Sequence, residues 1–321
     1  MNQISIAVTF FLSLVLTSLP FLLLGTAVSS FLLVFVNKQR LAAIFPRNRV
    51  LGAIVGSAIG LILPVGQYGT IPVARRFLLE GVPPGVVFSF LTAAPTLNIV
   101  TLWLTWQTFS YSSIFFYRSL SVWLMAIVIG TLFSFYREKP RTDSEIPLES
   151  SLVLSGSFLP EEAASQPLQR VGSLVYEYKT RDRQAWPISV QLFLDNFIDE
   201  ALELGGLLII GCAIASVFQL LLPQSQLIAW GDTPVTQILV QLFFGFTLAV
   251  NASLSTFVPG SLITNLSVGS TLAFLLVASL IDIKAFILLL SAFRPKIVLY
   301  FGILCLLMTF LVALILSFYL G

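Results

Sequence analysis

Two ionisable residues stand out because they lie inside a long apolar run, where charged groups are costly. Asp282 and Lys284 interrupt the apolar stretch 267–292. An ionisable residue within such a span is by default a candidate for binding a solute or carrying a coupling charge. We expect Asp282 to contact a bound solute, and we rank Lys284 below it as a coupling residue. Alternatively, both lie near the cytoplasmic surface, where Lys284 extends to water and their pairing contributes little.

Two further segments, 63–72 and 250–260, combine polar residues with glycine or proline inside apolar sequence, and a shift of 184 residues places Gln67 on Asn251. Unwound backbone there would expose N–H and C=O groups, and helix N-termini attract anions. Alternatively, the breaks only kink packed helices, and the hydroxyls bond their own backbone. The neutral substrate-binding candidates in and after these breaks are Gln67, Tyr68, Thr70, Thr96, Asn98, Asn251, Ser253, Ser255 and Thr256.

A third polar pattern is an acidic stripe at the start of the apolar stretch 190–221. Asp195, Asp199 and Glu203 recur at every fourth position, which places them on one helix face. We favour the interpretation that they form the solvated start of a long helix, since Glu200 falls off the stripe. The alternative is a strip of carboxylates that carries protons for coupling.

The composition indicates that these residues belong to a chain surrounded by lipid. Of 321 residues, 57% are hydrophobic and 10% are charged, and the mean hydropathy is +0.96. Soluble domains carry about 25% charged residues, so a soluble protein, a disordered chain and a nucleic-acid-binding domain are excluded. The absence of histidine excludes a His-ligated metal, a Ser-His-Asp triad and an imidazole proton shuttle. No Walker A pattern is present, so we do not expect this chain to hydrolyse ATP. We also expect no catalysis, no cofactor and no metal site.

Apolar stretches of about 20 residues predict transmembrane helices. The interrupted regions 50–80 and 234–264 each predict two short spans or a re-entrant hairpin, because irregular backbone at membrane depth must be buried or line a wet cavity. The predicted fold is therefore an all-α integral membrane protein of about eight transmembrane helices plus two broken hairpins, or about ten spans. The clear spans are 4–36, 84–109, 113–136, 190–221, 267–292 and 297–319.

The hydrophilic region 137–189 separates two membrane halves, 1–136 and 190–321. It carries 7 Lys/Arg and 8 Asp/Glu, and we expect a cytoplasmic linker that is partly disordered. Placing this linker and the basic residues at 38–49, 75–76 and 294–296 in the cytoplasm puts 15 of 17 Lys/Arg inside. Arg118 then falls outside, and both chain termini face the exterior.

The two halves resemble each other. With an offset of 184 residues, the segment 85–91 aligns with 269–275, and Asn98 aligns with Asp282. An offset of 186 aligns 25–30 with 211–216. The loop 37–49 carries four basic residues, whereas the equivalent loop 222–234 carries none, and the bias reverses later in each repeat. Opposite charge bias at equivalent loops predicts an inverted pair of repeats, the architecture of many secondary transporters.

These segments resemble the bacterial predicted-permease family to which the ArsP organoarsenical efflux permeases belong. The resemblance covers both repeats and is carried by Ile-Pro-Val-Ala-Arg-Arg-Phe-Leu at 71–78, Gly-Val-Pro-Pro-Gly at 81–85, Phe-Leu-Thr-Ala-Ala-Pro-Thr-Leu-Asn at 90–98 and Leu-Ile-Asp-Ile-Lys at 280–284. It implies an integral-membrane, transporter-like protein of the bacterial cell membrane. The expected partners are the lipid bilayer and an unknown small solute, with no nucleic acid, and a homo-oligomer is compatible with this architecture.

The chain departs from the family at its breaks. Relatives often carry Cys-rich elements before the Ile-Pro-Val-Ala-Arg-Arg stretch, where this chain has Gly66-Gln67-Tyr68. Thiolates are the ligands that suit soft metalloids, and Cys212 and Cys305 lie in apolar runs instead, as small core residues. Export of trivalent arsenicals is therefore not expected. The leading interpretation is a secondary-transporter-like permease for another small solute, and the alternatives are a channel or a non-transporting membrane scaffold.

Overall fold

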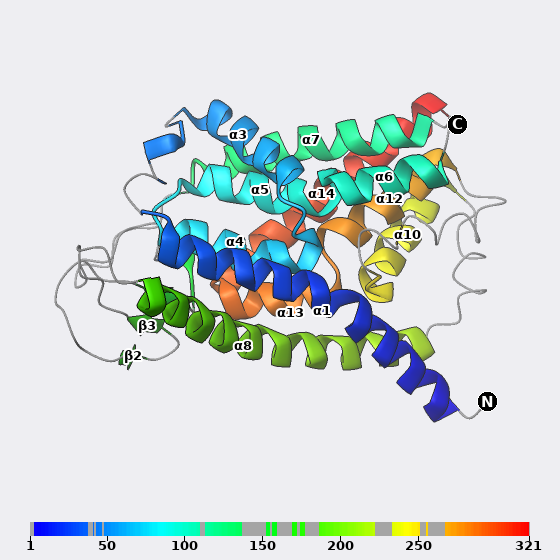
Figure 1. The fold of residues 1–321 in the computed structure, drawn as a ribbon. Coiled ribbons are helices and arrows are strands. Elements are labelled where there is room, and N and C mark those ends of the chain that lie inside the picture. The colour runs from blue at the N-terminus through cyan, green and yellow to red at the C-terminus, as the bar shows by residue number, and fades with distance from the viewer. Residues whose placement is uncertain are drawn as a thin grey trace.

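The computed structural model is a bundle of helices that run roughly along one common direction (Figure 1). The described residues form α1 (Gln3–Phe35), α3 (Arg49–Ile62), α4 (Gly66–Leu79), α5 (Pro84–Leu97), α6 (Ile99–Thr108), α7 (Ser113–Phe133), α8 (Trp186–Leu221), α10 (Pro234–Leu248), α12 (Val268–Leu280), α13 (Ile283–Ala292) and α14 (Pro295–Leu320). Three short strands also occur, β1 (Gly156–Phe158), β2 (Gln169–Val171) and β3 (Leu174–Tyr176). The structure describes residues 3–37, 41, 43–46, 48–109, 113–136, 152–154, 156–158, 169–171, 174–176, 186–221, 233–250, 255 and 267–320.

All six spans expected from the sequence recur as helical segments that are long and apolar enough to cross a membrane. The interrupted regions contain shorter helices. In the first of them, α3 and α4 have 14 residues each. At 1.5 Å per residue each is about 21 Å long, which is less than the roughly 30 Å of a bilayer core. The fold is therefore a helical membrane bundle whose first interrupted region contains helices too short to cross the bilayer core.

Two of the expected spans are broken in the middle. Asn98 separates α5 from α6 in an extended conformation, and its Oδ1 accepts the N–H of Thr101 at 2.8 Å. Asp282 separates α12 from α13 in the same way, and its Oδ1 accepts the N–H of Ala285 at 2.6 Å. Asn and Asp are strong helix N-caps because their side-chain oxygens satisfy first-turn N–H groups. Both breaks are thus helix starts within a single apolar segment.

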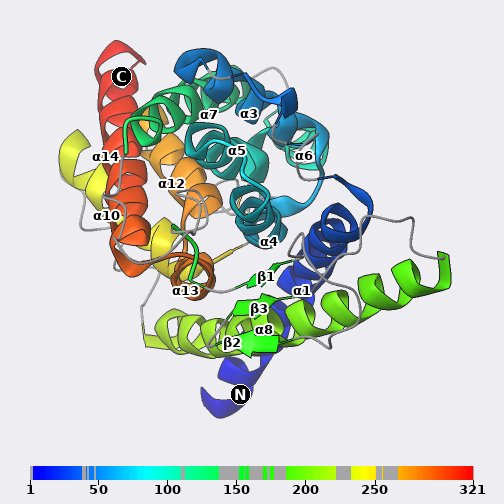
Figure 2. The same ribbon diagram turned by 90° about the vertical axis from the view of Figure 1, so that its left-hand side faces the viewer.

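The helices form layers that place α4 and α13 in the interior. Figure 2 shows α1 and α8 crossing at one side of the bundle, with α4 and α13 between them and the helices α5 and α12. In Figure 1 both chain ends lie at the same end of the bundle, opposite the strands. The pair α5–α6 runs from the strand end toward the end with the termini, and α12–α13 runs the other way.

Glycine allows α1 and α4 to approach closely. A Cβ on Gly25 would collide with the backbone of Gly69, and a Cβ on Gly69 would collide with the carbonyl oxygen of Phe21. The backbone of α4 therefore lies directly against that of α1. Pro20 lies within α1, and Figure 1 shows this helix bent about midway, as expected for an internal proline.

The hydrophilic region is not wholly irregular, although the described membrane part is all-helical, as the sequence predicts. Its three strands form a sheet in the order β1-β3-β2, with β1 parallel and β2 antiparallel to β3. Just before β1, the chain pairs with the connection between α13 and α14: the N–H of Leu154 donates to the carbonyl of Ala292 at 2.9 Å, and Val153 bridges Phe293. Backbone pairing thus attaches this region to the second membrane half.

Candidate functional site

The first turns of α4 and α13 meet in the interior of the bundle. The hydroxyl of Tyr68 on α4 donates to Oδ2 of Asp282 at 2.6 Å, and both side chains are fully buried. Asp282 thus uses one oxygen to cap α13 and the other to accept from Tyr68. Hydrogen bonds to a charged group are stronger than neutral ones, so this bond holds the two short helices together at their starts.

Lys284 belongs to the same group of buried residues. Its Nζ donates to Oγ of Ser18 on α1 at 2.9 Å and lies 4.7 Å from the ring centroid of Tyr68, within the range of a cation–π contact. Lys284 is fully buried, so the alternative in which it extends to the cytoplasmic surface is wrong. We call Ser18, Tyr68, Asp282 and Lys284 the central cluster.

The helix α8 closes the fourth side of the central cluster. The Cα of Gly211 faces the backbone of Lys284, because a Cβ there would lie 3.2 Å from the lysine Cα. The neighbouring Cys212 is fully buried. The two charges of the cluster have opposite signs and form no direct ion pair among the described residues. A net-neutral set of charges with separate hydrogen-bond partners therefore lies in the core.

Gln67, which precedes Tyr68 in the first turn of α4, leaves hydrogen-bonding capacity unused. Its side chain is 2% exposed, yet neither amide atom has a hydrogen-bond partner. The start of α4 also lacks a side-chain cap, since Val65 occupies that position. Buried polar groups are nearly always paired with protein, water or a ligand. An unpaired amide next to an uncapped helix start is thus typical of a place where a polar molecule binds.

Of the remaining candidates from the sequence, some hydrogen-bond to backbone carbonyls of their own helix, and one hydrogen-bonds across the contact between α5 and α12. Thr96 on α5 donates to Oγ of Ser279 on α12 at 2.8 Å, which links the two broken spans. Thr70 donates to the carbonyl of Gly66, the local bonding that the alternative interpretation expected. Asn98 caps α6 and donates to the carbonyl of Ala94 at 2.9 Å. Ser255 is buried, and the candidates Asn251, Ser253 and Thr256 lie outside the described residues.

The acidic stripe on α8 divides into two parts. Asp195 and Asp199 are exposed, as expected for the start of a solvated helix. Glu203 is 41% exposed at its side chain and lies 3.5 Å from Arg75 on α4. Glu200, which the stripe excluded, is buried and pairs with Arg75 at 2.6 Å. The reasoning from spacing therefore missed the one carboxylate on this helix that lies in a buried ion pair.

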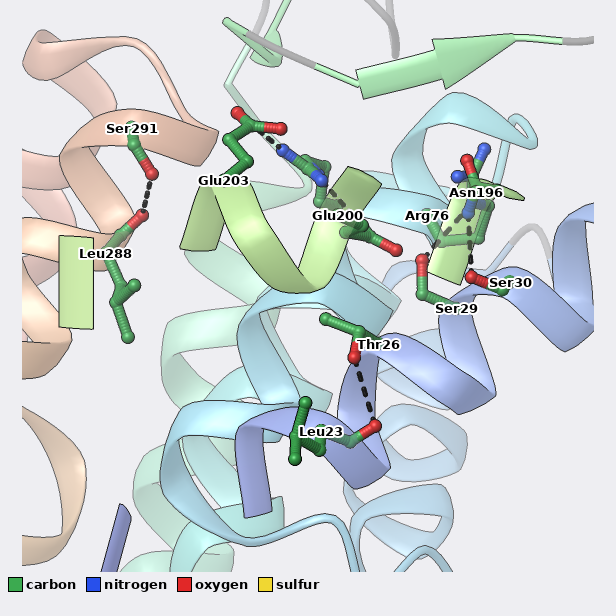
Figure 3. A network of polar contacts seen from close by, with 11 residues as sticks. Leu23, Thr26, Ser29, Ser30, Arg76, Asn196, Glu200, Glu203, Leu288 and Ser291 are labelled. Carbon is green, nitrogen blue, oxygen red and sulfur yellow. Dashed lines mark hydrogen bonds and ion pairs between the residues drawn. The ribbon is translucent and has the colours of Figure 1, made fainter. Parts of the chain in front are cut away.

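The pair belongs to a group of polar contacts at the end of the bundle that carries the linker. Nε of Arg76 donates to Oγ of Ser29 on α1 at 3.4 Å, and Nδ2 of Asn196 on α8 donates to Oγ of Ser30 at 2.7 Å. Figure 3 shows these side chains projecting from α4, α8 and α1 toward one another. We call this set the linker-end cluster: Ser29, Ser30, Arg75, Arg76, Asn196, Glu200 and Glu203.

Three arginines that the charge pattern assigned to one side of the membrane lie inside helices. Arg75 and Arg76, expected on the cytoplasmic side, lie within α4 and are 2% and 1% exposed. Arg118, expected on the exterior side, lies within α7, is 1% exposed and donates to Oγ1 of Thr105 at 2.8 Å. The positive-inside rule describes loop charges, so it does not apply to arginines that side-chain partners hold inside a bundle.

Two parts of the site gave no signal in the sequence. Ser18 is one hydroxyl among several in an apolar stretch. The one feature that marks it in the sequence is that it lies two residues before Pro20. Arg75 and Glu200 are 125 residues apart, so spacing could not pair them. Among the described residues there is no group of three or more Cys, Asp and Glu side chains that could hold a metal ion.

Known proteins resemble this chain along nearly its whole length. A family model described as predicted permease (ArsP_1) matches residues 3–318. The UPF0718 protein YcgR of Bacillus subtilis (strain 168) is 29% identical over 308 residues, which cover 96% of this chain and 93% of the relative. A protein of Streptococcus mutans serotype c named "Putative two-component membrane permease complex subunit" is 28% identical over 292 residues, or 91% of this chain and 88% of that one. No solved structure matches the chain.

Proposed function

The chain belongs to the predicted-permease family, and from that membership we propose that it is a secondary-transporter-like permease. It moves a small solute across the bacterial cytoplasmic membrane and carries out no chemical reaction. The linker lies in the cytoplasm, and both chain termini face the exterior. This orientation follows from the basic residues of the linker and the loops, and both termini lie at the end opposite the strands (Figure 1).

One observation carries this proposal. A buried aspartate and a buried lysine lie at the start of α13, where α13 meets the start of another short helix, α4. Burying two charges is costly, so such residues in a membrane bundle are expected at a solute or ion pathway. Transporters place their sites where discontinuous helices begin, because the first-turn N–H groups there bind polar ligands.

The repeats support an alternating-access mechanism. We propose that they are inverted, since α5–α6 and α12–α13 run in opposite directions and begin their second helices at aligned caps, Asn98 and Asp282. The packing also repeats: a Cβ on Gly85 would lie 2.8 Å from the carbonyl oxygen of Gly130, and a Cβ on Gly269 would lie 2.5 Å from that of Ala313. Two such halves can rock against each other about a central site.

The cluster also suggests the class of solute. From the sequence, a single carboxylate among neutral donors favoured a small polar, cationic or protonated solute. With Lys284 in the same cluster the local charge is balanced. We therefore propose a small polar solute that is neutral or carries both a cationic and an anionic group, bound by Asp282, Lys284 and the amide of Gln67.

A partner protein is a second element of the proposal. The Streptococcus mutans relative carries the name of a complex subunit, and the linker of this chain attaches to the connection between α13 and α14. We propose that the linker, residues 137–189, holds a cytoplasmic partner of the permease. Co-purification of the full chain and of a variant with Leu152 and Val153 changed to Asp tests this: loss of a specific partner is expected, and an unchanged set of partners contradicts it.

Transport is tested with purified protein in liposomes. The vesicles are incubated with a panel of isotope-labelled amino acids, polyamines, organic acids and sugars, and the retained label is counted. Wild type is expected to accumulate at least one solute that Lys284→Met does not. The control is Arg118→Gln, which removes a buried cation outside the central cluster and should keep the uptake. If wild type and empty liposomes retain the same label for every solute, the permease proposal fails.

A further inference from the structure

The central cluster and the linker-end cluster lie on the same helix faces. On α4, Tyr68 and Arg75 are seven residues apart, which is two helical turns and about 10 Å. On α8, Glu200 and Gly211 are eleven residues apart, or three turns and about 16 Å. Ser18 and Ser29 on α1 have the same spacing of eleven. One interface between α4 and the pair α1–α8 thus carries two polar layers.

An apolar layer separates the two polar layers. Leu22 on α1, Ile71 on α4, and Leu204 and Leu208 on α8 occupy the intervening turns, and all four are 2% exposed or less. Anything that reaches the central cluster from the linker end along this interface must therefore first pass Arg75 and Glu200 and then this apolar layer.

The ion pair of Arg75 with Glu200 in the linker-end cluster can open at a modest cost in free energy. Arg75 and Glu200 are 2% and 3% exposed at their side chains, so both charges lose their hydration to form the pair. That loss largely cancels the attraction between them, and a buried ion pair adds little net stability compared with apolar residues. Oε2 of Glu200 has no hydrogen-bond partner, as expected beside a place that water reaches in another state. Separating α4 from α8 would return both charges to water at modest cost.

We propose that the ion pair of Arg75 with Glu200, supported by Glu203, is the gate that closes the permeation path at the linker end. In this structure the gate is closed. When α4 moves away from α8, the pair breaks, the charged side chains hydrate, and the path to Asp282 and Lys284 opens toward the linker side. This inference rests on the proposed permease function, which supplies the path that the gate closes.

The native Cys212 reports on this path without a known solute. It lies beside the central cluster, and Cys305 can be changed to Ser so that Cys212 is the single thiol. Inverted membrane vesicles, which expose the linker side, are treated with a membrane-impermeant maleimide, and the modified fraction is followed over time. Arg75→Gln is expected to raise the initial rate at least about tenfold, since it leaves the buried charge of Glu200 without its partner and so favours the open state, in which water hydrates that charge. From the opposite side the rate should not change.

Two variants separate gating from general loosening. Arg75→Glu combined with Glu200→Arg restores the pair in reverse and should return the rate toward that of wild type. Arg118→Gln removes an equally buried arginine on α7 and should leave the rate unchanged. The proposal is overturned if Arg75→Gln fails to raise the rate, or if Arg118→Gln raises it as much. The assay measures access rather than flux, so a raised rate without any transport would support the gate and refute the permease proposal alone.

Discussion

Asp282 is expected to serve two separable roles, one structural and one electrostatic. Its Oδ1 accepts the N–H of Ala285 and caps α13, while Oδ2 accepts the hydroxyl of Tyr68 near the ammonium of Lys284. In Asp282→Asn the amide oxygen can still cap α13, because Asn and Asp are equally good N-caps. The charge next to Lys284 is lost. In Asp282→Ala both roles are lost.

The magnitudes follow from the two bonds. Loss of an N-cap costs about 1 kcal/mol, within a range of roughly 0.5–2 kcal/mol. Loss of a hydrogen bond to a charged group costs about 1.5–3 kcal/mol. Asp282→Ala should therefore lower the free energy of unfolding by about 2–5 kcal/mol. Asp282→Asn should be more stable than Asp282→Ala by about 1 kcal/mol, the contribution of the cap.

The assay is reversible unfolding of purified protein in mixed micelles of mild detergent and SDS, with the tryptophan fluorescence as the signal. A matched pair at the aligned cap controls for position: Asn98→Ser and Asn98→Ala both lose the bond donated to Ala94, but Asn98→Ser keeps a capping oxygen and should be more stable than Asn98→Ala by about 1 kcal/mol. The expected order of stability is wild type, then Asp282→Asn, then Asp282→Ala. If Asp282→Asn is as unstable as Asp282→Ala while Asn98→Ser remains more stable than Asn98→Ala, the capping argument for Asp282 is wrong.

Three further predictions concern packing, topology and substrate. Gly69→Ala should destabilise the protein by about 1–3 kcal/mol because its Cβ would collide with α1, whereas Gly206→Ala, with open space around it, should not; equal melting temperatures for the two variants would contradict this packing. A cysteine at Thr233 should react with an impermeant maleimide only from outside the cell and one at Ile44 only from inside, and the same sidedness for both would refute the inverted repeat. Expression should not protect an arsenical-sensitive strain against trivalent arsenicals, since both cysteines are buried in helices; resistance that survives Cys212→Ser and Cys305→Ser would refute the thiol argument.

The sequence predicted the membrane segments well because hydropathy is a property of whole stretches. All six expected spans recur, and the resemblance to the predicted-permease family is confirmed. The breaks at Asn98 and Asp282 were not predicted as helix starts, since one polar residue hardly changes the hydropathy of its window. The sequence nevertheless singled out both residues, because a polar group in an apolar span requires a partner.

The contacts between distant helices could not be predicted. Whether Lys284 extends to the membrane surface or remains in the core depends on Ser18 and Tyr68, which come from other helices. The charge pattern predicted only that Arg75 lies on the cytoplasmic side, because the positive-inside rule gives no information about tertiary contacts. Arg75 can be buried because it pairs with Glu200, and only the tertiary structure brings these two residues together. Short-range spacing on α8 therefore pointed to its exposed carboxylates and away from the buried one.

Alternating access requires that water and a solute reach the central cluster from each side of the membrane in turn. The most direct measurement is the reactivity of Ser18→Cys, in a background with Cys212→Ser and Cys305→Ser, toward an impermeant maleimide. Right-side-out and inverted vesicles are compared, and full unfolding in SDS gives the total thiol. The account predicts slow but complete modification from each side separately. A thiol that reacts from neither side, or from one side only, would contradict alternating access. A thiol that reacts from neither side would indicate that the central cluster is a structural part of the core.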